Sequence, residues 1–315
     1  MIYFAHRMQA QDLKTFMNAV DEEVIAGPLR VDGQWAAALR EAEIIVCPGS
    51  EISEDLVDHC ANARWYHSVS AGVDKVPFRL LEQRGILLSN SRGIHAKSIA
   101  EQALGMMISF TRGLHINLLN QREHRWEREY PLTELTDQTL CIVGSGTIGL
   151  EVARKAKAFD MRVIGVKRTP LPLPNHDEVV EFSELHQVLE VSDFVMALTP
   201  LTAETYHLFD AAAFRSMKST AVFLNFARGD VVDEKALIAA LQSRTIAGAA
   251  LDVFHEEPLP ADSPLWTMNN VLISPHNGGW TPHHDKRLIP IILENYRAYR
   301  EGKPLPTAVN LKKGY

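Results

Sequence analysis

Short apolar runs alternate with helical segments along the first hundred residues of the chain. The apolar runs lie at residues 1–4, 44–47, 65–69 and 86–88, and the helical segments at 11–20 and from Ser53 onward. This alternation is typical of parallel strands joined by crossover helices. The first part of the chain is therefore predicted to form a small parallel sheet covered by helices.

The second half repeats this pattern with longer apolar runs. They lie at residues 140–143, 162–166, 194–198, 221–224, 246–253 and 271–274, each separated from the next by a plausible helix. Near-continuous apolar strands without alternation are what a sheet covered on both faces requires. Six strands of a doubly wound parallel sheet are predicted. Helices are expected at 98–110, with Ser98 as N-cap and Glu101 three residues on, and at 285–302.

A glycine-rich segment follows the apolar run at 140–143 directly and leads into a helical pattern. It has the form Gly-x-Gly-x-x-Gly and predicts a dinucleotide-binding turn between a strand and a helix. Gly144 suits the tight turn, Gly146 lets backbone approach a pyrophosphate, and Gly149 allows close packing of helix on strand. The diphosphate is expected at the helix N-terminus, where unpaired N–H groups favour anions. The predicted contacts are Gly144, Gly146, Thr147, Ile148 and Gly149.

Length and composition set the broad class. A chain of 315 residues exceeds one comfortable core, so two domains are expected. The net charge of -7, without a run of basic and aromatic residues, argues against nucleic-acid binding. Three cysteines without metal-ligand spacing suggest buried thiols and no metal. No signal-like or membrane-spanning stretch is seen, so a cytoplasmic enzyme with no membrane contact is expected.

Three predicted strands of the second half are each followed by a residue suited to catalysis. Arg228 follows the run at 221–224, Glu257 follows 246–253, and His276 follows 271–274. In an open parallel sheet, ligands bind beyond the carboxyl ends of the strands. Taken singly, each residue has a plain alternative: a surface cation, a solvated loop acid, and a packed or helix-capping histidine. Together they favour one site beside the cofactor.

The charges of these three residues suggest their chemistry. A guanidinium donates two parallel hydrogen bonds to a substrate carboxylate, so Arg228 is expected to fix the substrate. An imidazole exchanges a proton near neutral pH, and a neighbouring carboxylate stabilises its charged form. His276 is therefore the predicted acid/base, with Glu257 tuning it. Because the cofactor carries the hydride, the predicted reaction is the reversible reduction of a 2-oxo acid.

With these motifs the sequence resembles the D-isomer-specific 2-hydroxyacid dehydrogenase family over nearly its whole length. The resemblance rests on residues 143–149, 225–233, 251–258 and 274–279, and on 70–74 and 90–101 in the first half. It implies that Arg228, Glu257 and His276 are the catalytic residues. It also implies that the loop of Ser70, Ala71 and Gly72 offers backbone N–H groups to the substrate carboxylate, and that Asp252 lies near the nicotinamide.

The predicted fold class is α/β, with a doubly wound (Rossmann) cofactor domain and a smaller flavodoxin-like α/β substrate domain. Residues 1–97 with 286–315 are assigned to the substrate domain and 98–285 to the dinucleotide-binding domain. Further cofactor contacts follow from the resemblance and the strand ends. They are Thr199, Pro200, Thr205, Phe226, Ala227, Asp252, Gly278 and Gly279.

The end of the second strand of the cofactor domain indicates which nicotinamide cofactor is used. NAD enzymes usually place a carboxylate there for the ribose hydroxyls. This chain instead has Lys167, Arg168 and Thr169, which suit a 2′-phosphate. NADP(H) is therefore the preferred cofactor and NAD(H) remains possible. The alternative is that both cations are solvated loop residues.

The substrate is expected to be a small 2-oxo acid such as glyoxylate or hydroxypyruvate, as in the reductases of this family. The sequence departs from the usual family pattern at Asn277 and Trp280, where many members of the family have smaller apolar or hydroxyl residues, and in the segment 281–284. Adjacent His283 and His284 are interpreted as a solvated loop with no metal, because no partner has metal-ligand spacing. Formate dehydrogenases, a related class, pair the catalytic His with a Gln. The presence of Glu257 therefore argues against formate dehydrogenase activity.

Two further alternatives concern partners. The polar segment 117–135 could be an arm that packs on a second chain, and a homodimer is what the resemblance implies. Trp126 within it could be core, a dimer contact, or a residue that reaches the neighbouring subunit's substrate pocket. From a different class comes a non-enzymatic NAD(P)-sensing protein of the same fold, as in the related C-terminal-binding corepressors. The complete Arg, Glu and His set weakens that reading.

Overall fold

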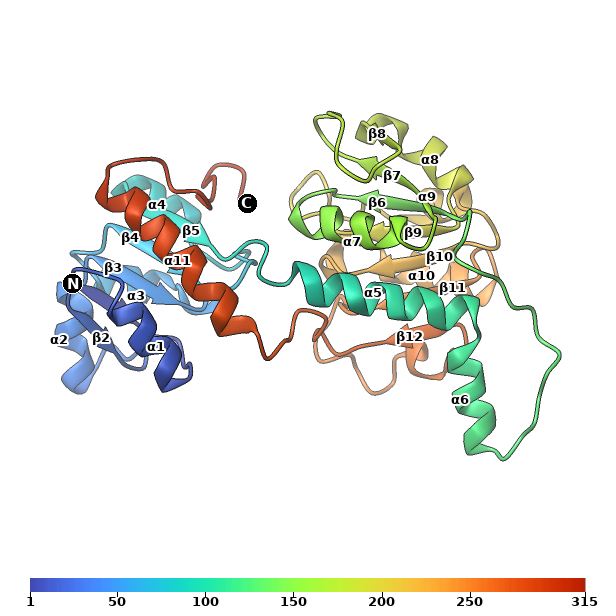
Figure 1. The fold of residues 1–315 in the computed structure, drawn as a ribbon, viewed down its shortest axis with the longest axis horizontal. Coiled ribbons are helices and arrows are strands. Elements are labelled where there is room, and N and C mark those ends of the chain that lie inside the picture. Colours follow the sequence, from blue (N-terminus) through green and yellow to red (C-terminus); the bar gives the residue numbers. More distant parts are fainter. Residues whose placement is uncertain (315) are drawn as a thin grey trace. The chain divides into compact units, whose positions relative to one another are not determined.

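The computed structural model describes residues 1–314, which form two compact units. Unit 1 consists of Met1–His95 together with the described residues from Thr281 onward, and unit 2 is Ala96–Trp280. The chain thus passes from unit 1 to unit 2 after His95 and returns at Thr281. Each unit contains one parallel sheet with helices on both faces (Figure 1).

The sheet of unit 1 has five parallel strands in the order β2-β1-β3-β4-β5, which is the flavodoxin-like order. The strands are β1 (Ile2–Phe4), β2 (Val24–Ala26), β3 (Ile44–Cys47), β4 (Trp65–Ser68) and β5 (Leu87–Asn90). The helices are α1 (Ala10–Met17), α2 (Gly33–Glu41), η1 (Gly49–Glu51), α3 (Glu54–His59), α4 (Phe78–Arg84) and α11 (His284–Arg300).

Two apolar cores lie on opposite faces of this sheet. On one face Leu39 of α2, Leu56 of α3 and Leu81 of α4 pack with Ile45 and Tyr66. On the other face α1 and α11 contribute Phe16, Leu288 and Ile292, which pack with Ile2 and Ile44. Residues alternate between these faces along β1 and β3, so the strands are buried on both sides, as their uninterrupted apolar sequence predicts.

The sheet of unit 2 has seven parallel strands in the order β12-β11-β10-β9-β6-β7-β8. The strands are β6 (Thr139–Val143), β7 (Arg162–Val166), β8 (Glu178–Val180), β9 (Phe194–Ala197), β10 (Val222–Asn225), β11 (Gly248–Leu251) and β12 (Val271–Ile273). The chain leaves β6 in one direction through β7 and β8, and then continues on the other side of β6 from β9. The strand order therefore reverses at β6, where doubly wound sheets bind their ligands.

Helices cover both faces of this sheet (Figure 1). Side chains of α5 and α7 form the core of one face with Leu140, Ile142 and Met196. Those of α8, α9 and α10 form the core of the other with Val143, Val195 and Phe223. The helices are α5 (Ala96–Thr111), α6 (Leu114–Arg122), α7 (Thr147–Lys157), η2 (Phe182–Glu184), α8 (Leu185–Val191), α9 (Ala211–Ser216), η3 (Gly229–Val231), α10 (Glu234–Gln242) and η4 (Pro264–Thr267).

The α/β fold class and the doubly wound sheet predicted from the sequence are confirmed, with three differences in detail. The strands β2 and β8, each of three residues at a sheet edge, were not predicted. The predicted role of Ser98 as N-cap is wrong. Helix α5 begins at Ala96, so Ser98 lies in its first turn and its hydroxyl donates to the carbonyl of Gly279 at 3.2 Å.

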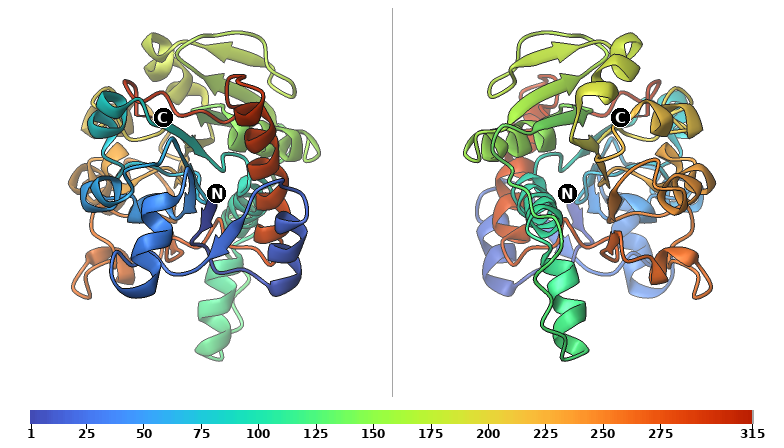
Figure 2. Two further views of the ribbon diagram at one scale, coloured as in Figure 1. Left: turned by 90° about the vertical axis from the view of Figure 1, so that its left-hand side faces the viewer. Right: turned by 90° about the vertical axis from the view of Figure 1, so that its right-hand side faces the viewer.

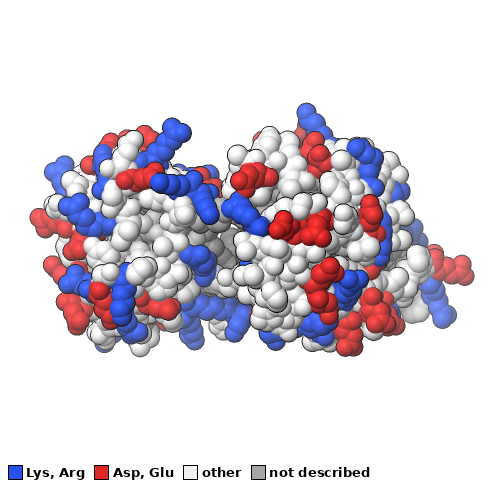
Figure 3. Space-filling view, turned by 90° about the horizontal axis from the view of Figure 1, so that it is seen from above, with Lys and Arg blue, Asp and Glu red and all other residues white. Residues whose placement is uncertain are grey.

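Two surface features bear on partners. Helix α6 and the loop that follows it project from the sheet of unit 2, as Figures 1 and 2 show. Acidic and basic side chains are interspersed on both units in the view of Figure 3, without a face of one sign. Among residues 1–314, no helix combines the length and apolar character needed to cross a membrane.

Candidate active site

The glycine turn lies at the reversal point of the sheet of unit 2. Gly144 has φ +99°, which favours glycine, and a β-carbon there would lie 2.7 Å from the backbone of Leu198 and Thr199. A β-carbon on Gly149 would lie 3.1 Å from Ile142 of β6, so this glycine lets α7 pack closely on the strand. Around Gly146, by contrast, no atom would lie within 4 Å of such a β-carbon. The backbone is open on that side.

This turn fits the diphosphate of a dinucleotide. Gly146 is the N-cap of α7, whose first N–H groups include those of Thr147 and Ile148. Across the turn, the hydroxyl of Thr199 is buried and has no hydrogen-bond partner within residues 1–314. A buried polar atom without a partner is costly, so a ligand group there would relieve the cost. Thr205 holds the loop after Thr199 by donating to the carbonyl of Pro200 at 2.6 Å.

The end of β7 presents the cationic residues that the sequence predicts. Lys167 is half-buried, whereas Arg168 and Thr169 are exposed. Arg168 forms an ion pair with Glu204, which lies in the loop after β9. Sequence reasoning missed Glu204, because this residue follows β9 and is distant in the sequence from the end of β7. A neighbouring loop thus supplies the acidic partner that the strand end lacks.

Arg228 begins the turn after β10, and Asn225 shapes that turn. The amide oxygen of Asn225 accepts from the N–H of Ala227 at 3.0 Å, and its amide nitrogen donates to the carbonyl of Arg228 at 3.1 Å. The next residue, Gly229, lies against the loop after β11. A β-carbon on Gly229 would lie 1.9 Å from the carbonyl oxygen of Phe254. Only glycine fits here, so the loops that carry Arg228 and Glu257 are packed directly together.

The buried carboxylate of Asp252 organises the turn after β12. Its oxygens accept from the hydroxyl of Ser274 at 2.6 Å and from the N–H groups of Asn277 and Gly278, each at 3.1 Å. Gln102 of α5 donates to Ser274 at 2.7 Å and adds a longer bond of 3.4 Å to Asp252. These bonds fix both ends of the segment that contains His276. Sequence reasoning missed Gln102 and Ser274 as partners of Asp252.

His276 and Glu257 meet at the carboxyl edge of the sheet. Nδ1 of His276 lies 2.7 Å from Oε2 of Glu257, and the other oxygen of Glu257 accepts from the N–H of Phe254 at 3.0 Å. His276 has φ +49°, a left-handed conformation that is uncommon for a residue with a side chain and that concentrates at functional sites. Its N–H donates to the carbonyl of Asp252 at 2.8 Å, which holds it there.

The order of the strands places these residues in a row along one edge. Beyond the carboxyl ends, from β12 to β7, stand His276, then Asp252 with Glu257, Arg228, Thr199, Gly144 and Lys167. The buried ring of Phe226 and the backbone of Ala227 line the middle of this row, and a β-carbon on Gly278 would lie 3.1 Å from the Phe226 ring. The residues predicted for catalysis and for cofactor binding thus share one edge of unit 2.

The loop predicted to bind substrate belongs to unit 1 and is held by its own partners. Asn90 donates to the carbonyl of Ala71 at 2.8 Å, and the N–H of Ser91 donates to the carbonyl of Ser70 at 3.2 Å. The hydroxyl of Ser70 donates to the carbonyl of Gly72 at 3.1 Å. The loop carbonyls are thereby engaged.

One expectation for this region is wrong. His283 is exposed, but His284 is the first residue of α11 and only 26% of its side chain is exposed. His284 is therefore not part of a solvated loop. The local sequence does not show this burial, because His6 and His95, whose rings lie beside it, come from distant parts of the chain.

Comparison with known proteins identifies the family. The family model described as "D-isomer specific 2-hydroxyacid dehydrogenase, NAD binding domain" matches residues 104–278. A glyoxylate reductase of Thermococcus gammatolerans is 34% identical over 86% of this chain and 84% of its own. A glyoxylate/hydroxypyruvate reductase B of Citrobacter koseri is 34% identical over 88% and 87%.

A solved structure extends the likeness to the whole fold. The D-isomer specific 2-hydroxyacid dehydrogenase of Xanthobacter autotrophicus Py2, in complex with NADPH and MES, superposes with a TM-score of 0.85 at 29% identity, over 100% of this chain and 99% of the other. The fold and the site define an NAD(P)-dependent oxidoreductase. The chain belongs to the D-isomer-specific 2-hydroxyacid dehydrogenase family and is similar to its glyoxylate reductases.

Proposed function

We propose that this enzyme reduces small 2-oxo acids of the glyoxylate and hydroxypyruvate kind to D-2-hydroxy acids. The observation that carries the proposal is the 2.7 Å contact between Nδ1 of His276 and Glu257, at the same sheet edge as the glycine turn. The names of the Thermococcus and Citrobacter relatives support the substrate class. The D configuration follows from the family.

The contact defines the roles within the pair. Because Nδ1 of His276 faces Glu257, Nε2 is the ring nitrogen left to face a substrate. The bound nicotinamide supplies the hydride that reaches the carbonyl carbon. Nε2 of His276 gives its proton to the carbonyl oxygen, and the Glu257 carboxylate stabilises the charged imidazole that provides it. In the reverse direction the neutral imidazole takes the proton back.

The remaining residues bind and orient. Arg228 is proposed to hold the substrate carboxylate, for which a planar fork of N–H donors is suited. The N–H groups of Ser70, Ala71 and Gly72 would bind a substrate carboxylate from the substrate domain, which we propose to be unit 1. The cofactor domain is proposed to be unit 2. Asp252 acts by fixing the turn that positions His276, and lies near the nicotinamide.

We further propose that NADP(H) is preferred over NAD(H). Lys167 and Arg168 provide positive charge at the end of β7, and Thr169 provides a hydroxyl. The Xanthobacter structure contains NADPH. Arg168 would exchange its ion pair with Glu204 for the 2′-phosphate. A comparison of kcat/KM with NADPH and NADH tests this assignment, and a preference for NADH would refute it.

A homodimer in the cytoplasm is the proposed state of the enzyme. Helix α6 and the loop after it expose Leu114, Leu118 and Trp126, of which Trp126 is 91% exposed. Apolar side chains on a projecting arm suit contact with a second copy. The three cysteines are buried and unpaired, which suits a reducing compartment. Light scattering of the purified protein tests the dimer, and a monomeric mass would contradict it.

The reaction is tested by the loss of NADPH absorbance with a panel of 2-oxo acids. We expect turnover with glyoxylate and hydroxypyruvate and slower turnover with larger 2-oxo acids. Tight NADPH binding without turnover of any of them would contradict the proposal and favour a sensor of the same fold.

A further inference from the structure

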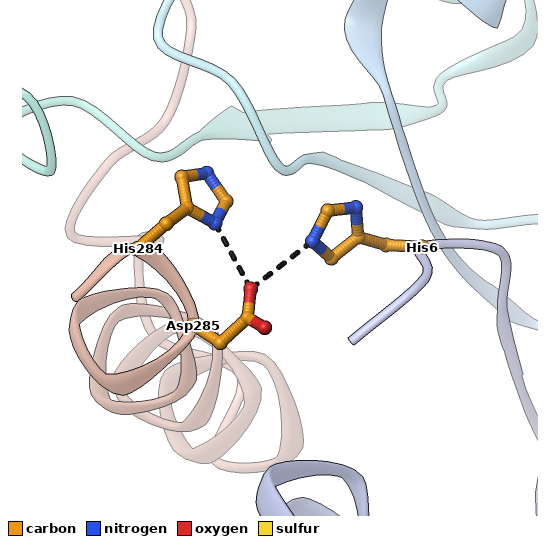
Figure 4. A group of neighbouring side chains, drawn as sticks. All are labelled: His6, His284 and Asp285. Carbon is orange, nitrogen blue, oxygen red and sulfur yellow. Dashed lines mark hydrogen bonds and ion pairs between the residues drawn. The ribbon is translucent and has the colours of Figure 1, made fainter. Parts of the chain in front are cut away.

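A second cluster of polar side chains lies in unit 1, apart from the residues assigned to the reaction. Nε2 of His6, just after β1, lies 3.3 Å from Oδ1 of Asp285, and Nδ1 of His284 lies 3.0 Å from the same oxygen. Figure 4 shows both rings pointing toward this carboxylate. His6 and Asp285 are 279 residues apart in the sequence.

These atoms have the spacing of ligands to one metal ion. The ligand atoms of His6, His284 and Asp285 all lie within 4.8 Å of one another. Bonds of about 2.0–2.2 Å to a tetrahedral zinc ion place neighbouring ligand atoms roughly 3.3–3.6 Å apart. The two contacts to Asp285 are close to that length. Within residues 1–314, this is the one group of three or more His, Cys, Asp and Glu side chains whose ligand atoms all lie within 4.8 Å of one another.

The ligand types and their exposure also suit a metal. Two imidazoles and one carboxylate form the donor set of sites that bind zinc and similar divalent ions and keep an open position. The side chains are 20%, 26% and 22% exposed for His6, His284 and Asp285, so an ion can enter from solvent. We propose that these three residues form a binding site for a divalent transition-metal ion of the zinc class.

A third imidazole stands beside the cluster. The ring of His95 lies 5.8 Å from that of His284, centroid to centroid. Helix α11 also holds the segment before His95, since Arg287 donates to the carbonyl of Ile94 at 3.2 Å. His95 is thus a candidate for the fourth position, which water otherwise fills.

The charge of Asp285 is necessary to this proposal. His284 and Asp285 are the first two residues of α11, and the positive end of a helix disfavours a cation. The carboxylate offsets that field and contributes a negative ligand. Without a metal, the same three side chains form a hydrogen-bonded triad. Binding of a metal ion by these three side chains is measurable independently of turnover.

The experiment uses the full-length chain without a histidine tag, after treatment with EDTA. Calorimetric titration with Zn²⁺ is expected to show one ion per chain, and Co²⁺ is expected to give the visible absorption of a tetrahedral complex. His6→Ala and Asp285→Asn should each weaken Zn²⁺ binding at least 100-fold. His283→Ala is the matched control, because it removes an exposed neighbouring histidine, and should leave the affinity within about twofold.

Several results would contradict the proposed metal site. Absence of stoichiometric Zn²⁺ binding by the wild-type chain would do so, as would equal affinity in the wild type, His6→Ala and Asp285→Asn. Circular dichroism and thermal unfolding of each variant verify that the chain, including unit 1, is folded. Should a variant fail that check, the Co²⁺ spectrum of the wild type decides, since an octahedral spectrum of weakly bound Co²⁺ would contradict a His, His, Asp site.

Discussion

The carboxylate of Asp252 and the hydroxyl of Ser274 are joined by a 2.6 Å hydrogen bond beneath the turn that carries His276. The same carboxylate accepts from two backbone N–H groups of that turn. We predict that Asp252→Asn lowers the free energy of unfolding by about 2–3 kcal/mol, because a neutral amide accepts weaker hydrogen bonds than a carboxylate and turns an NH2 group toward the N–H of Gly278. It should also lower kcat more than tenfold, since a displaced His276 loses its alignment. Denaturant unfolding and steady-state kinetics measure the two effects.

An exposed acid provides the control for this substitution. Asp262→Asn changes the same functional group at an exposed position and should alter stability by less than about 0.5 kcal/mol. Equal effects of Asp252→Asn and Asp262→Asn would mean that the Asp252 carboxylate does not organise the turn.

Gly229 provides a steric test of the site. A β-carbon there would lie 1.9 Å from the carbonyl oxygen of Phe254, so Gly229→Ala must separate the loops that carry Arg228 and Glu257. We predict a stability loss of about 3 kcal/mol and loss of measurable turnover. Gly105→Ala is the control, because Gly105 is exposed within α5 and a β-carbon there meets nothing within 4 Å. Its higher helix propensity should raise the free energy of unfolding by about 1 kcal/mol. Unchanged turnover in Gly229→Ala would show that the two loops need not touch.

Arg168 allows a test of cofactor preference at one side chain. Loss of a charge-assisted contact with the 2′-phosphate costs about 1.5–3 kcal/mol, so Arg168→Ala should lower kcat/KM for NADPH about 10- to 100-fold. The value for NADH should change little. Arg162→Ala, which removes an exposed arginine at the start of β7, is the control. A parallel fall with both cofactors would place Arg168 outside the phosphate site.

His67 makes the stability of unit 1 sensitive to acid. It is fully buried between the hydroxyls of Ser89 and Ser91, and burial lowers its pKa to about 3. The unfolded chain takes up this proton below about pH 6.5, whereas the folded chain does not. The contribution of His67 to stability is therefore lost as pH falls from about 6.5 toward 3, at up to about 1.4 kcal/mol per pH unit.

The slope of stability against pH isolates this effect. Between pH 6 and 4.5, the free energy of unfolding should fall more steeply in the wild type than in His67→Asn, whatever their absolute stabilities. Parallel slopes would show that His67 is protonated in the folded chain. The hydroxyl of Ser91 contacts His67, and its N–H donates to the carbonyl of Ser70 in the proposed substrate loop. His67→Asn is therefore also expected to raise KM for the 2-oxo acid.

Apolar runs predicted most of the fold because buried parallel strands leave an uninterrupted apolar sequence. This holds for 44–47 and 162–166, which are the strands β3 and β7. It fails for β2, a three-residue edge strand whose residues are only partly buried or exposed. β8 is likewise three residues long and begins at an exposed glutamate. Both strands lie at sheet edges, where burial is incomplete, although the edge strands β5 and β12 were predicted from their apolar runs.

The site was predictable as far as it depends on strand ends. His276 and Glu257 follow neighbouring strands, so their meeting follows from the topology. The partners from other elements were not predictable in this way. Gln102 reaches Asp252 from α5, and Glu204 reaches Arg168 from the loop after β9. Such contacts depend on the packing of distant segments, which spacing does not reveal.

The central claim is that His276 supplies the proton in the reduction of a 2-oxo acid. The most direct measurement is the rate of NADPH oxidation with glyoxylate by the wild type and by His276→Asn, with NADPH affinity measured by fluorescence on the same samples. We predict turnover by the wild type, a loss of at least 1,000-fold in the variant, and NADPH affinity within about threefold. Turnover by His276→Asn at a rate near that of the wild type would contradict the account.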